Sequence, residues 1–597
     1  MDKQATIGFI LIGIVLVAWM WLQAPQVPPQ APARQDSTHA AAQDTMKKPS
    51  PPAQTKADTV SRIDAPSQFF ASRTQGAERI LTIRTDLYTA ELTTRGGLLR
   101  TWELTKYLTW DKRPVQLVDY ASGGDFSLLF TSGDGKLVNT RAFFFDIAGA
   151  RGNVIDLTGG GTASVDMVLP IAGGGRIVKR FTFTNGTYQF DVDLTLEGAA
   201  SVVSNFEYQI VWEHGLRYAE QNSVDESGFT GAEALSGGEM VEIDARTPGE
   251  PQKLDVTGAT SWVSTHTKYF TLAMLAEEGK TQGAYLEGRA SAAPNSGLVE
   301  TYTVALKMPY RGGAGESSKV QVYLGPMDYR TLREYGRGLD QTISLGARWI
   351  IRPIAQYFMI PLFEFLHSFI SNYGLVILLF SIIIKVILHP LTRTSMRSMR
   401  KLQALQPMMN EIREKYKGDT EKMGQAQMNL YKEYGINPAS GCLPLLLQMP
   451  ILFALYQVFR STIGLRQAEF VGWITDLSIP DAIVHLPFTV PFFGITQISG
   501  ITLAMGATMF VQQRMTPTDP RNKAMVWLMP LLFMLMFNNL PSGLNLYYFI
   551  FNLLSIGQQY LFNRQHKDEP LRKVEPKKKQ GGILGRISKD LPKVRQR

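Results

Sequence analysis

The hydrophobic positions follow three different patterns along the 597 residues of the chain. Ala5–Leu22 is an almost unbroken apolar run, residues 60–340 alternate between apolar and polar positions, and nearly all other long apolar runs follow residue 350. An apolar run of this length reaches about 27 Å as a helix, whereas strict alternation is typical of strands with one buried face. The pattern therefore predicts a membrane anchor, a water-soluble β-domain and a helical membrane module, in that order.

The central region shows the period of two that half-buried strands require. In residues 188–196 and again in 206–212, aromatic and aliphatic residues face one way and polar residues face the other. The inward positions are Tyr188, Phe190, Val192, Leu194 and Leu196, followed by Phe206, Tyr208, Ile210 and Trp212. Glycine clusters at 159–161 and 173–175 supply turns. We expect a large antiparallel β-sandwich over residues 61–340.

The apolar runs after residue 340 predict an interfacial helix and five membrane spans. Residues 341–368 mix charged residues and two prolines with aromatic residues, which is typical of an amphipathic helix in the membrane interface. The spans are expected at Phe369–Leu388, Leu443–Phe459, Phe492–Val511, Ala524–Leu540 and Gly543–Phe562. These five would form the core over residues 369–563, and the N-terminal anchor makes six. Several are short for a hydrocarbon core of about 30 Å, which indicates partners or thinned lipid.

Positive charge is concentrated on one side of these spans. The loop between the second and third spans holds nine Lys and Arg residues against five acidic residues, while the next loop holds more acidic than basic residues. The tail, residues 564–597, holds twelve Lys and Arg residues against four acidic residues. Because cytoplasmic loops carry the excess of Lys and Arg, both termini are expected in the cytoplasm and the β-domain on the outer side.

Residues 1–24 are expected to remain attached as a signal anchor. The competing interpretation is a cleaved signal peptide, which requires small residues before the cleaved bond. Here Gln23 and Ala24 are followed by Pro25, which disfavours cleavage. Residues 25–60 are rich in Pro, Ala and Gln, a composition that cannot bury enough apolar surface to fold, so they are expected to form a disordered tether.

The last span carries a stripe of polar residues. Five of them recur at intervals of three and four, which places them on one face of a helix. They are Asn545, Tyr548, Asn552, Ser555 and Gln559, and earlier spans add Gln448, Gln457 and Gln497. Hydrogen bonding between helices would explain any one of these residues, at about 0.6 kcal/mol per contact. A stripe over four turns favours a hydrated groove.

Lys385 is the ionisable residue that stands out in the second span. It follows the apolar run 375–384 and precedes His389 and Pro390. A lysine at the bilayer centre costs about 2.5–3.5 kcal/mol, so such a residue is by default a functional candidate. Its position close to the cytoplasmic boundary favours the simpler interpretation, in which the side chain snorkels to the headgroups. A position facing the groove is the alternative.

The composition argues against an enzyme. The β-domain contains no P-loop, no HExxH and no nucleophile elbow, and its histidines are His214 and His266, which are expected to be structural or surface residues. Cys442 is the only cysteine, so neither an intramolecular disulfide nor a cysteine-based metal site can form. We expect no catalytic residues, no metal and no cofactor.

Several motifs resemble one family. The run 441–451, GCLPLLLQMPI, with Ala454, Leu455 and Tyr456 after it, is similar to the third-span signature of YidC membrane protein insertases. The segment 541–544, PSGL, leading into Tyr547 and Tyr548, resembles the start of their last span, and 466–477 resembles their outer loop. The resemblance is close over residues 345–565 and looser over the tether and β-domain.

The resemblance implies a site and a mechanism. It implies a hydrophilic groove that is open to the cytoplasm and to lipid, with a basic residue in the second span. Lys385 stands where many relatives have Arg. Lysine keeps the positive charge but cannot form the paired hydrogen bonds of a guanidinium group. Tyr548 matches a substrate-contacting position. Residues 391–437 match a cytoplasmic helical hairpin, and the outer β-domain matches Gram-negative relatives, whose fold resembles sugar epimerases without their catalytic residues.

The hairpin itself is rich in methionine, which suits contact with varied partners. Its expected contact residues are Met396, Met399, Leu402, Met408 and Met409, although two helices packing only on each other would explain the same residues. Residues Lys577–Lys579 add to a basic tail. Anionic lipids would account for that tail, and the resemblance implies ribosome contact as well.

Together these features predict a membrane protein insertase and chaperone in the bacterial inner membrane. It would act without covalent catalysis on nascent membrane proteins, alone or with the Sec translocon. The alternative is a polytopic transporter or channel for a small solute. Transporters often contain internal repeats and discontinuous helices, and we detect no repeat in this sequence. An enzyme that modifies envelope sugars is a third and weaker possibility, because the β-domain lacks catalytic groupings.

Overall fold

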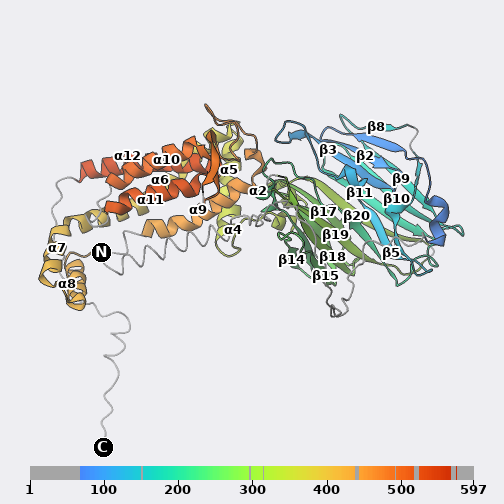
Figure 1. The fold of residues 1–597 in the computed structure, drawn as a ribbon, viewed down its shortest axis with the longest axis horizontal. Helices are drawn as coiled ribbons and strands as arrows, with labels where there is room; N and C mark the ends of the chain where they lie inside the picture. Colours follow the sequence, from blue (N-terminus) through green and yellow to red (C-terminus); the bar gives the residue numbers. More distant parts are fainter. Residues whose placement is uncertain are drawn as a thin grey trace, which may run out of the picture. The chain divides into compact units, whose positions relative to one another are not determined.

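The computed structural model describes residues 67–149, 152–294, 297–313, 315–436, 443–490, 493–515, 523–566 and 573. The chain divides into two compact units, with the boundary between Ile343 and Ser344 (Figure 1). The N-terminal anchor, the tether and nearly all of the basic tail lie outside the described residues. The end of the β-domain expected from the sequence, residue 340, lies three residues before this boundary.

In the described residues, the first unit contains three sheets and two short α-helices. The five-stranded sheet has the order β4-β3-β2-β1-β8, from β1 (Ile80–Arg84), β2 (Tyr88–Thr93), β3 (Leu98–Leu108), β4 (Pro114–Gln116) and β8 (Val154–Asp156). The nine-stranded sheet has the order β14-β13-β16-β17-β20-β11-β10-β9-β7, from β7 (Asp146–Ala148), β9 (Thr162–Pro170), β10 (Arg176–Thr184), β11 (Gln189–Glu197), β13 (Gly231–Ser236), β14 (Glu239–Ile243), β16 (Thr260–His266), β17 (Phe270–Ala276) and β20 (Gly315–Pro326). The six-stranded sheet has the order β15-β18-β19-β12-β5-β6, from β5 (Ser127–Thr131), β6 (Leu137–Asn139), β12 (Glu207–Trp212), β15 (Gln252–Thr257), β18 (Gly283–Ala293) and β19 (Gly297–Pro309). The helices are α2 (Ser223–Ser227) and α3 (Tyr329–Glu334).

Alternation along the strands creates the core of this unit. In β11, Phe190, Val192, Leu194 and Leu196 are buried while the residues between them are half-exposed, as the sequence predicts. Tyr208, Ile210 and Trp212 are buried in β12 in the same way. The prediction for Phe206 is wrong, because it precedes β12 at a positive φ of 52° and is 71% exposed. A turn residue does not follow the period of the strand that it leads into.

The sheets pack face to face and share one buried lysine. Strand β16 of the nine-stranded sheet packs on β19 of the six-stranded sheet, which is a sandwich, and the third sheet adds Trp102 against Phe190. Lys179 in β10 donates to the carbonyl oxygens of Gly96, Gly97 and Phe126 at 2.9–3.1 Å. Those carbonyls precede β3 and β5, so this one side chain joins three sheets. Burial lowers the pKa of Lys179 to about 7.

The described residues of the second unit are mainly helical and include one strand pair. Its helices are α4 (Ile351–Ile354), the π-helical turn Ala355–Met359, α5 (Ile360–His367), α6 (Tyr373–Ala404), α7 (Gln406–Lys415), α8 (Thr420–Glu433), α9 (Leu443–Ser461), α10 (Gly500–Met515), α11 (Lys523–Phe537) and α12 (Ser542–Gln565). Its strands are β21 (Ala482–Val490) and β22 (Ile495–Ser499). The predicted interfacial segment is helical from Ile351 to His367.

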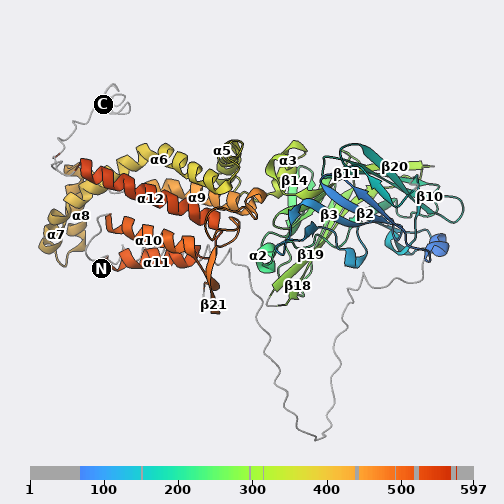
Figure 2. The same cartoon turned by 90° about the horizontal axis from the view of Figure 1, so that it is seen from above.

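Helix α12 packs against α6 and α10 inside this unit, and α10 packs against α11 (Figure 2). Contacts pair the first turn of α6 with the first turn of α12 and His389 with Gln558, so α6 and α12 run in the same direction. Figure 2 places α7 and α8 at one end of the helices and β21 at the opposite end.

The predicted span Phe492–Val511 is wrong in its first half. Residues 482–499 contain the hairpin β21–β22, and helix α10 begins at Gly500. Gly494 has a positive φ of 60° and turns the chain between the two strands, and the β-branched residues Ile495, Thr496 and Ile498 favour a strand. Apolar composition alone did not distinguish this strand from the start of a helix.

The second span is longer than predicted. Helix α6 continues past Pro390 to Ala404, so its 32 residues extend about 48 Å and include the start of the predicted cytoplasmic hairpin. Among the described residues, α6 is the helix that is by itself long and apolar enough to cross a membrane, and Trp527–Phe537 is a shorter apolar helix. The expected total of six spans stays a prediction.

Candidate functional site

The polar stripe of α12 faces the interior of the helical unit. Asn545, Asn552 and Ser555 are buried, and Tyr548 and Gln559 are half-buried. Leu553, Tyr560 and Leu561 on other faces of the same helix are 49–58% exposed. The periodicity of three and four therefore predicted the orientation of this helix. We call the five polar residues the α12 polar face.

Lys385 reaches this face from α6. Its Nζ donates to Oγ of Ser555 at 2.6 Å and lies 4.3 Å from the centroid of the Phe551 ring. The Ser555 hydroxyl donates in turn to the carbonyl oxygen of Phe551 at 2.7 Å, so its lone pairs are free to accept from the lysine. The side chain is 8% exposed. The snorkelling interpretation that the sequence favoured is therefore wrong for this structure, because the ammonium lies between two helices.

Among the described residues, Lys385 has no carboxylate as a partner for its charge. Its observed partners are a hydroxyl and an aromatic ring, and no acidic side chain in the described ranges forms an ion pair with it. A serine and a cation–π contact compensate a buried ammonium only in part, since an ammonium has three donor hydrogens. An anionic group that entered this region would therefore meet an attractive charge.

Asn545 and Tyr548 lie nearer the start of α12. Asn545 is fully buried, and its Nδ2 donates to Oγ1 of Thr502 on α10 at 2.8 Å and to the carbonyl oxygen of Phe537 at 3.2 Å. This residue has the interhelical bond that was the simpler explanation for the stripe. Tyr548 packs edge-on against the Phe537 ring, and its hydroxyl has no hydrogen-bond partner in the described part of the chain.

The other polar candidates do not join these contacts. Gln559 donates to Asn563 at 3.0 Å within α12, whereas Gln448 and Gln457 are half-buried residues of α9. Gln497 lies in β22 rather than in a membrane helix, and its carbonyl oxygen accepts from Asn538. Of the candidate set, the structure brings Lys385 and Ser555 into direct contact.

The helical hairpin forms a small core of its own. Asp419 caps α8 by accepting from the N–H of Lys422, and Gly418 has a positive φ of 104°, so these two residues turn the chain between α7 and α8. The core residues are Leu405, Met409, Leu430, Tyr434 and Ile436, with Leu402, Met408, Ile412 and Tyr431 partly buried against them. Met396 and Met399 are half-buried on α6, ahead of this core. Packing within the hairpin therefore accounts for Met409, and Met428 is 49% exposed.

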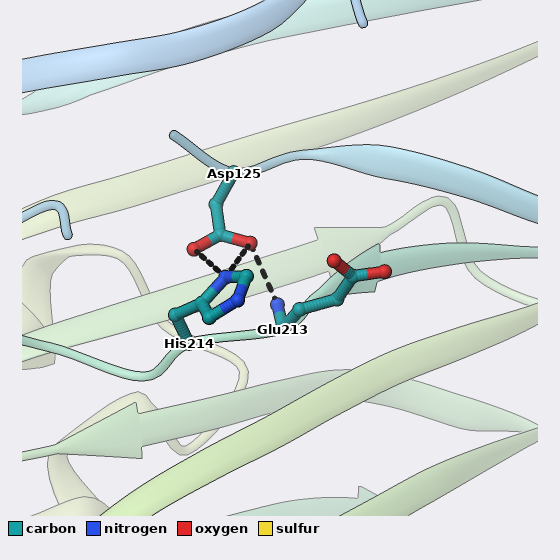
Figure 3. Close-up of side chains that lie close together, drawn as sticks. All are labelled: Asp125, Glu213 and His214. Carbon is teal, nitrogen blue, oxygen red and sulfur yellow. Dashed lines mark hydrogen bonds and ion pairs between the residues drawn. The ribbon is translucent and has the colours of Figure 1, made fainter. Parts of the chain in front are cut away.

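A charged cluster in the β-domain was missed by the sequence analysis. Nδ1 of His214 lies 3.1 Å from Oδ2 of the buried Asp125, and the backbone N–H of Glu213 donates to Asp125 at 2.8 Å (Figure 3). Burial raises the pKa of Asp125, and the hydrogen bond from His214 offsets this only in part. Burial also lowers the pKa of His214, but the hydrogen bond and charge of Asp125 outweigh it, so the net shift is upward.

Arg141 makes this cluster an ion network rather than a metal site. Asp125, Glu213 and His214 could together offer three ligand atoms. The Arg141 guanidinium donates to Asp125 at 3.0 Å and to Glu213 at 2.6 Å, so both carboxylates already have a cation. Arg141 also donates to the carbonyl oxygens of Ser122 and Gly124 at 2.8 Å, which holds it in place. A divalent ion would have to displace this arginine.

Of two further features of the site, one had a signal in the sequence. Phe551 lies four residues before Ser555, so it shares the polar face and could have been placed beside Lys385. The contact between Thr502 and Asn545 follows from no local pattern, because it depends on how α10 packs against α12.

Comparisons with known proteins cover nearly the whole chain. The family profile described as 60Kd inner membrane protein matches residues 365–569, and the profile described as YidC periplasmic domain matches residues 80–358. A membrane protein insertase YidC from Chlorobaculum parvum is 37% identical over 95% of this chain and 96% of its own length. Another from Chloroherpeton thalassium is 37% identical over 96% of this chain and 97% of its own length. A solved structure titled as an active YidC insertase aligns with 81% of this chain at 19% identity and a TM-score of 0.34.

The β-rich first unit and the helical second unit together define an inner membrane protein with a periplasmic domain. The chain belongs to the YidC family of membrane protein insertases. It is therefore a membrane protein insertase and not an enzyme, and integral membrane proteins are its substrates. The alternatives of a solute transporter and a sugar-modifying enzyme are set aside.

Proposed function

We propose that Lys385 and the α12 polar face line the groove through which this insertase passes the hydrophilic tail of its substrate. The single observation that carries this proposal is the buried ammonium of Lys385, which rests on Ser555 and Phe551 with no ion pair to an acidic side chain in the described residues. A membrane protein that retains such a charge pays for its burial, so the charge has a use.

The short helices support a route from this groove into lipid. Helix α10 has 16 residues and α11 has 15, which correspond to about 24 and 22 Å against a hydrocarbon core of about 30 Å. Lipid beside them would be thinned, which lowers the barrier for a polar tail to cross. The hydrophobic span of the substrate would leave the groove along α9 and α12. In this mechanism the residues hydrate and attract the tail, and no covalent step occurs.

The proposal includes the topology. Residues 1–24, α6, α9, α10, α11 and α12 would be the six spans, residues 341–368 would lie in the interface, and both termini would be cytoplasmic. The basic character of α7, α8 and the tail supports this orientation. Residues 25–60 would act as a disordered tether, and residues 564–597 would form a basic cytoplasmic tail.

The proposed partners follow from the same charges and surfaces. Met396, Met399 and the exposed Met428 would contact substrates or partners at the cytoplasmic end, where flexible methionine suits varied sequences. The basic tail would bind anionic lipids and ribosomal RNA. Membership of the family adds the Sec translocon as a further proposed partner.

Photocrosslinking tests the groove. A photoreactive amino acid at Asn552 or Gln559 on the polar face should capture the hydrophilic tail of a ribosome-stalled single-span substrate. The matched control is Leu553, which is 49% exposed on another face of the same helix and should capture no part of the tail. Equal capture of the tail from Leu553 and from the polar face would refute a groove at this position.

A further inference from the structure

The hairpin β21–β22 presents a surface that the insertion mechanism does not use. Five large apolar residues of this hairpin and of the loop before β21 are 44–64% exposed, which is unusual outside a membrane or an interface. They are Val471, Trp473, Ile483, Val484 and Phe488. We call them the hairpin surface.

The sequence around the hairpin surface matches a lipid environment. No Asp, Glu, Lys or Arg occurs from Ala482 to Gln513, a stretch that includes both strands and nearly all of α10. A water-exposed hairpin normally carries charges on its outer strand positions. In α10, the apolar residues Leu503 and Val511 are also 40% and 46% exposed.

The hairpin is held firmly to the ends of α10 and α11. The carboxylate of Asp481 accepts from the indole N–H of Trp473 and from the backbone N–H of Ile501, both at 2.8 Å. Asn538, just after α11, accepts from the N–H of Ser499 and donates to the carbonyl oxygen of Gln497. Gly500 allows close approach, because a side chain there would clash with Trp473 and Ile483. The hairpin surface is therefore a fixed extension of these helices.

Two physical limits together define the depth of the hairpin surface in the bilayer. Helices of about 22–24 Å cannot cover the full hydrocarbon thickness, so apolar surface beyond their ends remains in contact with lipid. Neither strand pairs with a third strand in the described residues, and open strand edges are not stable within the hydrocarbon. Both conditions are met at the boundary between headgroups and acyl chains, where water reaches the strand edges and apolar side chains reach lipid.

We propose that β21–β22 is a lipid anchor, with Val484 and Phe488 inserted into the headgroup–acyl boundary of the outer leaflet. The hairpin lies at the end of the helices opposite α7 and α8 (Figure 2), and the choice of leaflet rests on the topology proposed above. The anchor would fix the height of the short helices α10 and α11 and so maintain the thinned lipid beside the groove.

Spin-label depth measurements test this anchor. In the full chain with Cys442→Ala, a nitroxide is attached at Phe488→Cys or Val484→Cys and the protein is placed in phosphatidylethanolamine–phosphatidylglycerol vesicles. Insertion of a test substrate by each labelled protein shows that it is folded. The aqueous control is Lys417→Cys in the turn between α7 and α8.

The proposal expects collision with oxygen to exceed collision with a water-soluble nickel complex several-fold at both hairpin sites, and the reverse at residue 417. Collision dominated by the nickel complex at 484 and 488 would overturn it. Low collision with both reagents would also overturn it, because protein would then cover the hairpin. A separate membrane-impermeant thiol reagent applied to Lys417→Cys reports the topology, so an error in the leaflet is distinguished from an error in the anchor.

Discussion

Nζ of Lys385 on α6 lies 2.6 Å from Oγ of Ser555 on α12, two residues that are separated by 170 positions in the sequence. The two helices run in the same direction, and the contacts between them occur in the same order along both helices. The polar contact therefore has a fixed position on the helix pair, next to the ring of Phe551. A side-chain hydroxyl is a weak partner for an ammonium, and this weakness gives the site its proposed attraction for substrate carboxylates.

The hydroxyl of Ser555 should stabilise the helix pair. Ser555→Ala removes the acceptor for the buried ammonium and should lower the free energy of unfolding by about 1–3 kcal/mol. Ser555→Thr keeps a hydroxyl at the same position and should remain close to wild type. Thermal unfolding of both variants in the same detergent measures the difference. An alanine variant as stable as the threonine variant would show that the contact contributes nothing.

The β-domain should be largely dispensable for insertion. Residues 68–326 include every strand of the three sheets, and their removal as a unit avoids leaving a broken strand. A deletion that keeps the segment next to α4 should insert simple single-span substrates at close to the wild-type level, while changes in that segment should be tolerated least. Complete loss of insertion by a stably expressed deletion variant would contradict this prediction.

The basic tail should contribute to ribosome binding. Removal of Lys577–Arg597 should weaken association, and wild-type binding should fall steeply as salt rises, because contacts to phosphates release counterions. Cosedimentation of ribosomes with vesicles that contain either protein measures both effects. If truncation leaves cosedimentation unchanged, lipid contact alone explains the tail.

Glu226 should make the stability of the β-domain depend on pH. Burial raises the pKa of Glu226 to about 8. Between its ordinary pKa near 4.5 and pH 8, the folded state therefore holds a proton that the unfolded state has lost. The resulting stabilisation is complete below pH 4.5 and is lost as pH rises through 8. Hydrogen exchange of residues 219–230 in the full chain should become faster over this range.

Glu226→Gln is the matched variant, because its amide oxygen can still accept from the backbone N–H groups of Ala219 and Glu220. The variant should lose most of the pH dependence of exchange. If exchange depends on pH equally steeply in the glutamine variant, the pH dependence arises from other groups. Glu300 is one such group, because burial raises its pKa to about 7.

The strands were predictable because alternation is a local property. In β11 the buried and half-exposed residues follow the sequence pattern position by position, and the α12 polar face follows from the period of a helix in the same way. The hairpin β21–β22 was hidden, because short apolar strands and apolar helices have similar composition, and Gly494 with the β-branched residues after it gives only a local signal.

Contacts between distant segments were the part that sequence could not supply. Lys385 is compatible with both snorkelling and the helix interior, and the choice depends on the position of Ser555 on another helix. The network of Asp125, Arg141 and Glu213 joins segments that are up to 88 residues apart. Neither arrangement leaves a periodic signal along the chain.

The role of Lys385 is tested most directly by paired substrates that differ only in the charge of the leading tail. Insertion of an acidic-tailed and a neutral-tailed single-span protein is measured for wild type, Lys385→Arg, Lys385→Gln and Lys385→Glu at matched expression. At an effective dielectric constant of about 20 and a separation of about 4 Å, the attraction between the ammonium and a carboxylate is about 4 kcal/mol. We therefore expect Lys385→Arg to keep activity and Lys385→Gln to impair insertion of the acidic-tailed substrate. Lys385→Glu should slow its insertion most, by about tenfold or more. The neutral-tailed substrate should change least in all variants. Equal insertion of the acidic-tailed substrate by wild type and Lys385→Glu would contradict the proposed role of Lys385 in the groove.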